Sequence, residues 1–420
     1  MLTKLLYKIN DSVNGGAISK HYAEIRNHFK NNENNSLSKL KELLIHASEN
    51  AAFYSGKGNE INNYPVINKT SIRADFDSFQ AQNYAEKKLL TMTTSGSTGT
   101  PFTVNQDLNK KARNHADSLY FGELAGYELG NKLFYLKIWA KQKMSRSLMY
   151  KVQNMVPVDV LDLNEEKVEN LVKQMEQSKQ KISILGYVSA LEHFIRYSEK
   201  KNNKQIKADI ASVITMSEGL SSETRTQLEH VFGCPVVSRY SNLENGIIAQ
   251  QESNSDLFLV NTASYLVEIF HPDKDELLPD GELGRIVVTD LYNFAMPLIR
   301  YDTGDFGIRI QKGTKIFLKS VEGRKLDLLY DTGGQMVSSY IMYKNMWQYT
   351  EIEQYQLIQT HLKSYEFKIN CPSGFKKEEQ LVSEFKTYLG QDADFKVVYV
   401  DEIPLLDSGK RRKTVNLYYK

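Results

Sequence analysis

Short apolar runs and amphipathic stretches alternate along the chain between residues 131 and 246. Several of the amphipathic stretches begin with a helix-capping residue type, such as Asn164. Predicted strands cover 131–140, 181–188, 210–220 and the beginning of 235–246, and predicted helices cover 164–179, 190–201 and 221–233. Strands that alternate with helices of about a dozen residues indicate βαβ units and a mainly parallel sheet.

The chain has other patterns on either side of this region. Its first ninety residues are mostly helical in pattern, with an apolar stripe at Leu37, Leu40, Leu43 and Leu44, and a further helix is expected over 110–127. From Leu257 the segments become β-rich. After about residue 324 they are mixed, with predicted strands at 353–359, 365–371 and 394–403 and a predicted helix at 377–390.

These patterns predict an α/β fold with two domains, as expected for 420 residues. The large N-terminal domain covers 1–323. It is α/β with mainly parallel sheets to about residue 255, and it has a β subdomain over 257–320. A small α+β domain covers 324–420, and the boundary falls near residues 324–328.

The composition is that of a soluble globular protein, with 41% hydrophobic and 25% charged residues. A net charge of +2 gives no electrostatic argument for nucleic acid or a membrane surface. Cys234 and Cys371 lie far apart, which argues against a zinc cluster and suits a reducing compartment. Because no apolar run approaches the roughly 18 residues of a transmembrane helix and no signal peptide is evident, we expect a cytoplasmic protein.

Residues 93–101 read TTSGSTGTP and are rich in hydroxyl groups and glycine. Ser and Thr side chains offer donors, and glycines allow successive backbone N–H groups to converge on an anion. The Walker A pattern is absent, because Gly96 and Gly99 are spaced differently and no Lys-Ser/Thr pair follows. Taken alone, the stretch fits a surface turn as well as a phosphate loop.

Three later residues are further candidates for a nucleotide site. Glu244 lies in a polar loop after a short apolar strand, where a carboxylate can hold Mg²⁺ against a phosphate. Asp305 lies in an expected turn between two β segments, where it can accept both ribose hydroxyls or simply belong to a hairpin. Lys410 follows an Asp-Ser-Gly turn, in a run that also fits a solvated basic tail.

In this order the segments resemble the motifs of the adenylate-forming enzymes, which include acyl-CoA synthetases, nonribosomal-peptide adenylation domains and luciferases. TSGSTGTP is similar to their phosphate loop, Tyr240 to Glu244 to their aromatic-to-Glu motif, and IRYDTGD to their Tyr-x-Thr-Gly-Asp motif. GRKLD is similar to their hinge and DSGKRRK to their C-terminal Gly-Lys loop. PDGELGRIVVTDLYNFAMPLIRYDTGD and ILGYVSALEHF more closely resemble the phenylacetate–CoA ligase branch and its CapK-like relatives, which are associated with capsular polysaccharide synthesis.

The resemblance implies an enzyme in which a carboxylate attacks the α-phosphorus of ATP, giving an acyl-adenylate and pyrophosphate. A thiol or an amine then takes the acyl group. The implied ligands are ATP, Mg²⁺, a carboxylic acid and, as one acceptor, CoA, with no zinc. Lys410 would bridge the α-phosphate and the attacking carboxylate from a mobile C-terminal lid, and Glu244 would bind Mg²⁺.

The other implied site residues form three groups. The phosphate clasp comprises Thr94, Ser95, Gly96, Ser97, Thr98 and Gly99. The nucleoside site comprises Ser217, Glu218, Gly219, Tyr240 and Ser241 around the adenine, with Asp305 and Arg324 at the ribose. The acyl pocket comprises Tyr187, Val188, Ser189 and Asn242, whereas Phe134 and Trp139 are expected in the core.

Some positions depart from the family pattern and leave the second half-reaction open. Ser241 replaces a usual glycine, Leu326 occupies the place of the hinge carboxylate, and Gln335 stands where many relatives have Arg or Asn. The acceptor can be CoA, an amine or amino sugar, or a carrier-protein thiol in capsule or O-antigen decoration. A catalytically inactive nucleotide-binding scaffold is the other alternative, but the joint presence of Lys410, Glu244 and Asp305 favours an enzyme.

Overall fold

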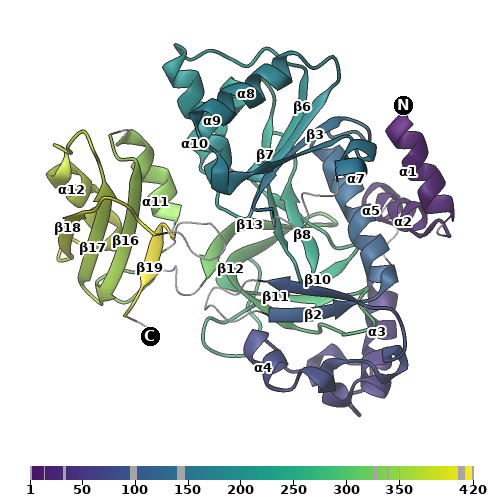
Figure 1. Ribbon diagram of the computed structural model, residues 1–420. Helices are drawn as coiled ribbons and strands as arrows, with labels where there is room; N and C mark the ends of the chain where they lie inside the picture. Colours follow the sequence, from purple (N-terminus) through teal and green to yellow (C-terminus); the bar gives the residue numbers. More distant parts are fainter. Residues whose placement is uncertain are drawn as a thin grey trace. The chain divides into compact units, whose positions relative to one another are not determined.

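The computed structural model describes residues 2–13, 15–31, 35–94, 102–139, 147–324, 329–337, 340–349, 351–404 and 412–418. The chain forms two compact units. The first comprises Met1–Glu218, Gln227–Thr303 and Gly307–Ser320, and the second comprises Gly219–Thr226, Gly304–Phe306 and Val321–Lys420. Figure 1 shows the N-terminal part of the chain in purple and the C-terminal part in yellow.

One 11-stranded mixed sheet has the strand order β10-β11-β12-β13-β9-β8-β7-β6-β5-β3-β4. Its first strands along the chain are parallel: β3 (Lys132–Lys137), β4 (Met155–Asp159), β5 (Ile182–Tyr187), β6 (Ile210–Met216) and β7 (Val236–Asn242). The sheet continues through β8 (Gly246–Gln251), β9 (Phe258–Val260), β10 (Tyr265–Phe270), β11 (Leu283–Asp290), β12 (Tyr301–Lys312) and β13 (Lys315–Arg324). Because β8 pairs antiparallel with both β7 and β9, the β-rich stretch continues the same sheet as the parallel strands.

Helices cover both faces of the parallel strands (Figure 1). A Cβ added at Gly186 of β5 would lie 3.6 Å from Leu191, which places α9 on one face. Ala125, at the end of α5, packs with Ile214 and Val237 on the other face. The described α-helices that precede β7 along the chain are α1 (Leu2–Val13), α2 (Ala17–Asn31), α3 (Ser36–Asn50), α4 (Lys69–Ala74), α5 (Leu108–Leu124), α7 (Ser147–Val152), α8 (Glu165–Glu176), α9 (Val188–Lys200) and α10 (Ser222–Phe232).

A short hairpin precedes α5. Its strands β1 (Leu90–Thr94) and β2 (Phe102–Gln106) pair antiparallel, with Thr94 opposite Phe102. Phe102 and Val104 are buried in a core that α3 and residues 291–301 also line. The short 3₁₀ turns are η1 (Ala52–Tyr54), η2 (Ile61–Asn63), η3 (Phe76–Phe79), η4 (Gln82–Tyr84), η5 (Val160–Asp162) and η7 (Met346–Gln348).

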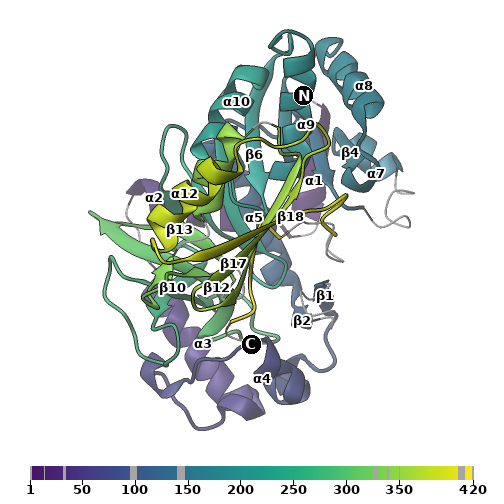
Figure 2. The same cartoon turned by 90° about the vertical axis from the view of Figure 1, so that its left-hand side faces the viewer.

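The second unit contains a four-stranded sheet of order β18-β17-β16-β19 (Figure 1). Figure 2 shows β17, β18 and α12 of this unit from another side. Its core joins Leu357, Phe367 and Ile369 of the sheet to Phe385 and Leu389 of a helix. The elements are β14 (Leu329–Tyr330), β15 (Met336–Val337), α11 (Tyr340–Asn345), β16 (Gln354–His361), β17 (Ser364–Asn370), α12 (Glu378–Leu389), β18 (Asp394–Tyr399) and β19 (Thr414–Asn416).

The α/β fold and a C-terminal α+β unit are confirmed. Predicted strands and helices from residue 164 onward coincide with observed elements to within a few residues at most ends. The β1–β2 hairpin was not predicted, and α5 begins at Leu108 because Asp107 caps it by accepting a hydrogen bond from the Lys110 N–H. Phe134 and Trp139 are buried, as expected. None of the described helices is long and apolar enough to cross a membrane.

Candidate active site

Glu244 lies in the tight turn between β7 and β8, at the point where the sheet changes from parallel to antiparallel pairing. Its side chain is only 2% exposed. The Tyr301 hydroxyl donates a hydrogen bond of 2.7 Å to Glu244 Oε1, and the Lys69 ammonium lies 3.0 Å from the same oxygen. A buried carboxylate of this kind is stable as a charge only because a donor and a cation compensate it.

The other carboxylate oxygen, Oε2, has no hydrogen-bond or ion-pair partner among the residues that the structure describes. Among the described residues, no group of three or more His, Cys, Asp or Glu side chains lies together as a metal site. Mg²⁺ is commonly held by one or two carboxylates together with substrate phosphates, and it keeps several waters. A single fixed carboxylate with a free oxygen therefore fits Mg²⁺ bound jointly with a nucleotide.

Lys69 is a residue that sequence reasoning missed. It is the first residue of α4, whose Asn68 cap accepts hydrogen bonds from the Thr70 and Ser71 N–H groups. The Lys69 ammonium also lies over the Phe102 ring, 5.4 Å from its centroid. Since Phe102 is opposite Thr94 in the hairpin, Lys69 brings positive charge to the strand pair that contains Thr94, the first residue of the predicted phosphate clasp.

Buried polar side chains form hydrogen bonds with the backbone of the Glu244 turn. Gln106 donates a hydrogen bond of 2.8 Å to the Glu244 carbonyl oxygen, and the Tyr265 hydroxyl donates to the Asn245 carbonyl oxygen. Burial raises the pKa of Tyr265 well above its ordinary value, so this hydroxyl remains a donor at neutral pH. Lys110 in turn donates to the Tyr265 hydroxyl at 2.9 Å, which ties the turn to α5.

Lys110 also pairs with a carboxylate of β11. Its Nζ lies 2.7 Å from Asp290 Oδ2, and both side chains are fully buried. Burial raises the pKa of the Asp290 carboxyl, while the nearby Lys110 charge opposes this rise. The turn that carries Glu244 is thus connected, through Tyr265, to the buried ion pair of Lys110 and Asp290.

The ends of β5 and β6 bring together two predicted groups, the acyl pocket and the adenine site. Tyr187 and Met216 are register partners, so Ser189 and Glu218 follow adjacent strand ends. The Glu218 carboxylate accepts hydrogen bonds from the Ser189 N–H at 2.7 Å and from the Ser189 hydroxyl at 3.1 Å. Negative charge at the first turn of α9 is favourable, because the helix presents free N–H groups there.

Backbone strain lies at the same edge. Ser217 has a φ of +68°, in the left-handed region that non-glycine residues seldom adopt. Val188, another predicted pocket residue, is buried as the first residue of α9, and Gly219 follows in a segment that belongs to the second unit. The sheet edge therefore gathers Tyr187, Val188, Ser189, Ser217 and Glu218.

Tyr240, Ser241 and Asn242 end β7 next to the Glu244 turn. Tyr240 is buried, and its hydroxyl donates a hydrogen bond of 3.2 Å to Thr303 Oγ1. The register shifts between Tyr240 and Ser241, so a bulge lies where relatives usually have glycine. Asn242 accepts a hydrogen bond of 2.8 Å from the Asn245 N–H and thereby closes the turn.

One local expectation about Asp305 is wrong. Asp305 does not lie in a turn, because β12 runs unbroken from Tyr301 to Lys312. Gly304, immediately before it, has a φ of +81°, and this conformation lets the strand continue through the Tyr-x-Thr-Gly-Asp motif. Arg324 is the last residue of β13.

The structure gives no geometry for two predicted motifs. Thr94 ends β1, but Ser95, Gly96, Ser97, Thr98 and Gly99 lie outside the described residues. Lys410 and Leu326 lie outside them too. The roles assigned to these residues therefore stay predictions.

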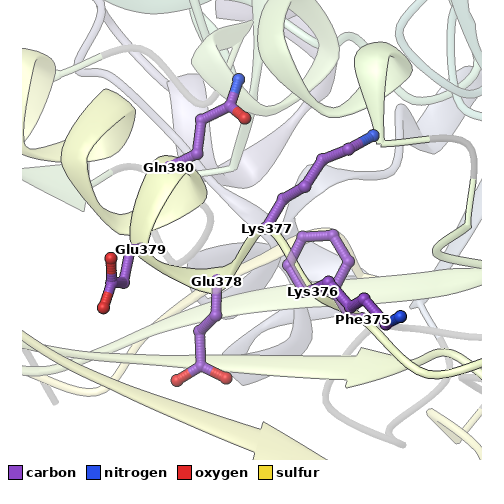
Figure 3. A pocket seen from close by; sticks show the side chains of 6 residues that line it. All are labelled: Phe375, Lys376, Lys377, Glu378, Glu379 and Gln380. Atoms are coloured by element: carbon purple, nitrogen blue, oxygen red, sulfur yellow. The ribbon is translucent and has the colours of Figure 1, made fainter.

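A hollow on the second unit involves none of these residues. It is lined by six consecutive residues, 375–380, at the start of α12. Figure 3 shows that their side chains spread in different directions. Lys377 is already paired with Glu351, at 2.7 Å. The hollow therefore lacks the convergent polar groups of a ligand site.

Comparisons with known proteins find similarity to CapK and to CoA ligases. The family CapK C-terminal domain matches residues 329–417. Protein CapK of Staphylococcus aureus is 24% identical over 95% of this chain and 93% of its own length. The chain is a CapK-like protein. This CapK-like chain is also a distant relative of phenylacetate–CoA ligases, since the Pseudomonas putida enzyme is 26% identical over 41% of the chain and 44% of its own length.

Solved structures give the CapK-like chain its fold class. The 2-hydroxyisobutyryl-CoA ligase in complex with 2-HIB-AMP matches with a TM-score of 0.70 and 16% identity, over 91% of this chain and 88% of that one. ATP-bound MatB from Rhodopseudomonas palustris matches with a TM-score of 0.56 and 16% identity, over 77% and 66%. The CapK-like chain thus has the fold of the adenylate-forming acyl-CoA ligases, as the sequence motifs predicted.

Proposed function

We propose that the chain activates a carboxylic acid by forming an acyl-adenylate from the acid and ATP. The observation that carries this proposal is the buried Glu244 carboxylate, fixed through Oε1 by Tyr301 and Lys69, while Oε2 has no partner among the described residues. The relationship to CapK over 95% of the chain and the fold shared with ligases whose complexes contain an acyl-AMP or ATP support it.

In this reaction the negative charge of the triphosphate must be compensated while the acid carboxylate approaches the α-phosphorus. Glu244 would hold Mg²⁺ through Oε2, and the ion would neutralise phosphate charge. The Lys69 side chain is 29% exposed, and its ammonium would reach a phosphate oxygen at the same place. Tyr301 would keep the carboxylate in one orientation, because its phenol donates to Oε1.

The predicted site residues form two groups, one for the nucleotide and one for the acid. Tyr240, Ser217 and Glu218 would frame the adenine, and Asp305 with Arg324 would bind the ribose. Tyr187, Val188, Ser189 and Asn242 would surround the acid, and Lys410 would complete the site from the C-terminal domain, 324–420.

The test is acid-dependent exchange of labelled pyrophosphate into ATP, with a panel of aryl, amino, hydroxy and dicarboxylic acids. We expect exchange with at least one acid, and Glu244→Gln should reduce it by about tenfold or more, because a charge at the phosphates is lost. Glu49→Gln is the matched control, since Glu49 is an exposed residue of α3. No exchange with any acid, in a folded sample that binds ATP, would refute the proposal and favour a nucleotide-binding scaffold.

The acyl acceptor is a separate question. CoA is favoured by the CoA ligases among the related proteins and structures, and an amine, amino sugar or carrier protein is the alternative that the sequence resemblance leaves open. Thioester formation in the presence of CoA and the activating acid distinguishes these acceptors. Exchange without thioester would direct the search to amines and carrier proteins.

A further inference from the structure

Arg239 lies on one face of the parallel sheet, near the carboxyl ends of the strands. Tyr187 pairs with Met216, and Met216 pairs with Arg239. Tyr135 pairs with Leu185, two residues before Tyr187. Because register partners and residues two apart share a face, Tyr135, Tyr187, Met216 and Arg239 all project from the same side. Ligands of open α/β sheets bind beyond this edge.

The Arg239 guanidinium has only one hydrogen-bond partner in the described part of the chain. Its Nε donates to Gln250 Oε1 at 2.8 Å, and no described carboxylate pairs with it. Three other partly or fully buried arginines do have such a partner: Arg113 pairs with Glu24, Arg285 with Asp302 and Arg300 with Glu268. Burial lowers the pKa of Arg239 to about 10. A cation in this setting gains most from an added anion.

Tyr135 places a hydroxyl group in the same region. Burial raises the pKa of Tyr135 to about 12, and the Arg239 charge acts in the opposite direction. Tyr187 also acts on Tyr135, so the three side chains are electrostatic neighbours. At neutral pH the Tyr135 hydroxyl is therefore protonated and able to donate to an anion beside Arg239.

The nearby carboxylates do not serve as counter-ions. Asp159 and Glu218 are close enough to raise the pKa of Tyr187, although burial is the larger cause. Glu218 is held by the Ser189 N–H and hydroxyl, and Asp159 accepts a hydrogen bond of 3.2 Å from the Leu161 N–H. Since neither pairs with Arg239, one positive charge is left at the wall of the predicted acyl pocket.

We propose that Arg239 binds an anionic group on the acid substrate, so that the substrate is a dicarboxylic acid whose second carboxylate stays unactivated. This inference rests on the proposed function, because it names the class of acid that the enzyme activates. A planar guanidinium offers a second carboxylate two parallel N–H donors, and Tyr135 offers a third. Tyr187, predicted for the acyl pocket, lies on the same face of the sheet as Arg239 and is the register partner of Met216 on the neighbouring strand.

Direct binding tests the inference without relying on turnover. The full chain is titrated calorimetrically with dicarboxylic acids of three to eight carbons, and with the monocarboxylic acid of each length. We expect at least one dicarboxylate to bind about 10- to 100-fold more tightly than its monocarboxylate, as a hydrogen-bonded charge provides. Arg239→Met should abolish this preference, and Arg239→Lys should restore part of it.

Two further variants keep the result interpretable. Arg196→Met changes an exposed residue of α9 and should preserve the preference. Tyr135→Phe removes only a hydroxyl, so it should weaken dicarboxylate binding several-fold even if Arg239→Met fails to fold. Equal affinities for both acid series, or an unchanged preference in Arg239→Met and Tyr135→Phe, would overturn the inference.

The two proposals fail in different ways. Dicarboxylate binding that depends on Arg239, without any pyrophosphate exchange, would overturn adenylation and leave the anion site standing. Exchange with monocarboxylic acids, unaffected by Arg239→Met, would support adenylation and overturn the dicarboxylate inference.

Discussion

Substituting Lys110 by Met would remove the cation from an ion pair that has no access to solvent. Lys110 Nζ lies 2.7 Å from Asp290 Oδ2, and both side chains are fully buried. Methionine keeps most of the apolar stem but leaves the Asp290 charge uncompensated in the core. Removing one partner of a buried pair costs about 3–5 kcal/mol, so we expect the unfolding free energy of the first unit to fall by that amount at neutral pH.

The loss should depend on pH in a defined direction. Burial holds the pKa of Asp290 above its ordinary value, and Lys110 limits the rise. A group whose pKa is raised on folding contributes stability that is present below its unfolded pKa and lost as pH rises through its folded pKa. Without Lys110 the folded pKa should rise further. The deficit of the variant should therefore be largest near about pH 8 and shrink toward about pH 5, as Asp290 takes up a proton.

Urea unfolding followed by fluorescence measures this deficit, because Trp139 reports on the first unit and Trp347 belongs to the second. Lys173→Met is the matched control, since its pair with Glu169 is exposed and 3.3 Å long. The control should lose less than about 0.5 kcal/mol. A deficit for Lys110→Met no larger than that of the control, or one that grows as the pH falls, would refute the electrostatic reasoning.

Three other variants test separate parts of the molecule. Tyr301→Phe removes a donor from the buried Glu244 carboxylate, so it should cost about 1–3 kcal/mol in urea unfolding and lower pyrophosphate exchange about 10- to 100-fold; wild-type exchange in the folded variant would contradict this. Gly284→Ala would place a Cβ 2.2 Å from a neighbouring carbonyl oxygen of the sheet, so it should cost about 1–3 kcal/mol in urea unfolding, and a wild-type midpoint would contradict this. Lys410→Ala should nearly abolish adenylate formation while calorimetry shows unchanged ATP affinity, and wild-type exchange rates would contradict its assigned role.

The sequence predicted the parallel strands β3, β5, β6 and β7 because they are short apolar runs bounded by turn residues, but it missed β4. Strand β5 and helix α9, for example, lie within a residue or two of the expected ranges. The hairpin strand β1 was missed because its sequence, LTMTT, has the polarity of a loop and pairs only through β2. Asp305 was expected in a turn because a glycine between polar residues is a turn signal in a sequence. In the structure Gly304 has a positive φ but lies inside the long strand β12.

The candidate site was predictable only where a local motif marks it. Glu244 follows an apolar strand in a recognisable motif, so the sequence alone was enough to name it as a candidate. Lys69 precedes it by a large separation along the chain and carries no motif, so only the folded structure joins the two. Arg239 is similar, because the absence of a counter-ion among the described residues is a property of packing.

The placement of Arg239 one position before Tyr240 has a consequence for how this scaffold can diversify. Successive residues of a strand point to opposite faces, so Arg239 and Tyr240 serve different surroundings although they are neighbours in sequence. If Arg239 binds the acid as proposed, a single codon change at 239 would alter which acid is accepted while the adjacent aromatic residue and the Glu244 turn stay in place. On the proposed function, selectivity and chemistry would then be separable during evolution, and a directed library at 135, 187, 216 and 239 would sample new acids without rebuilding the fold.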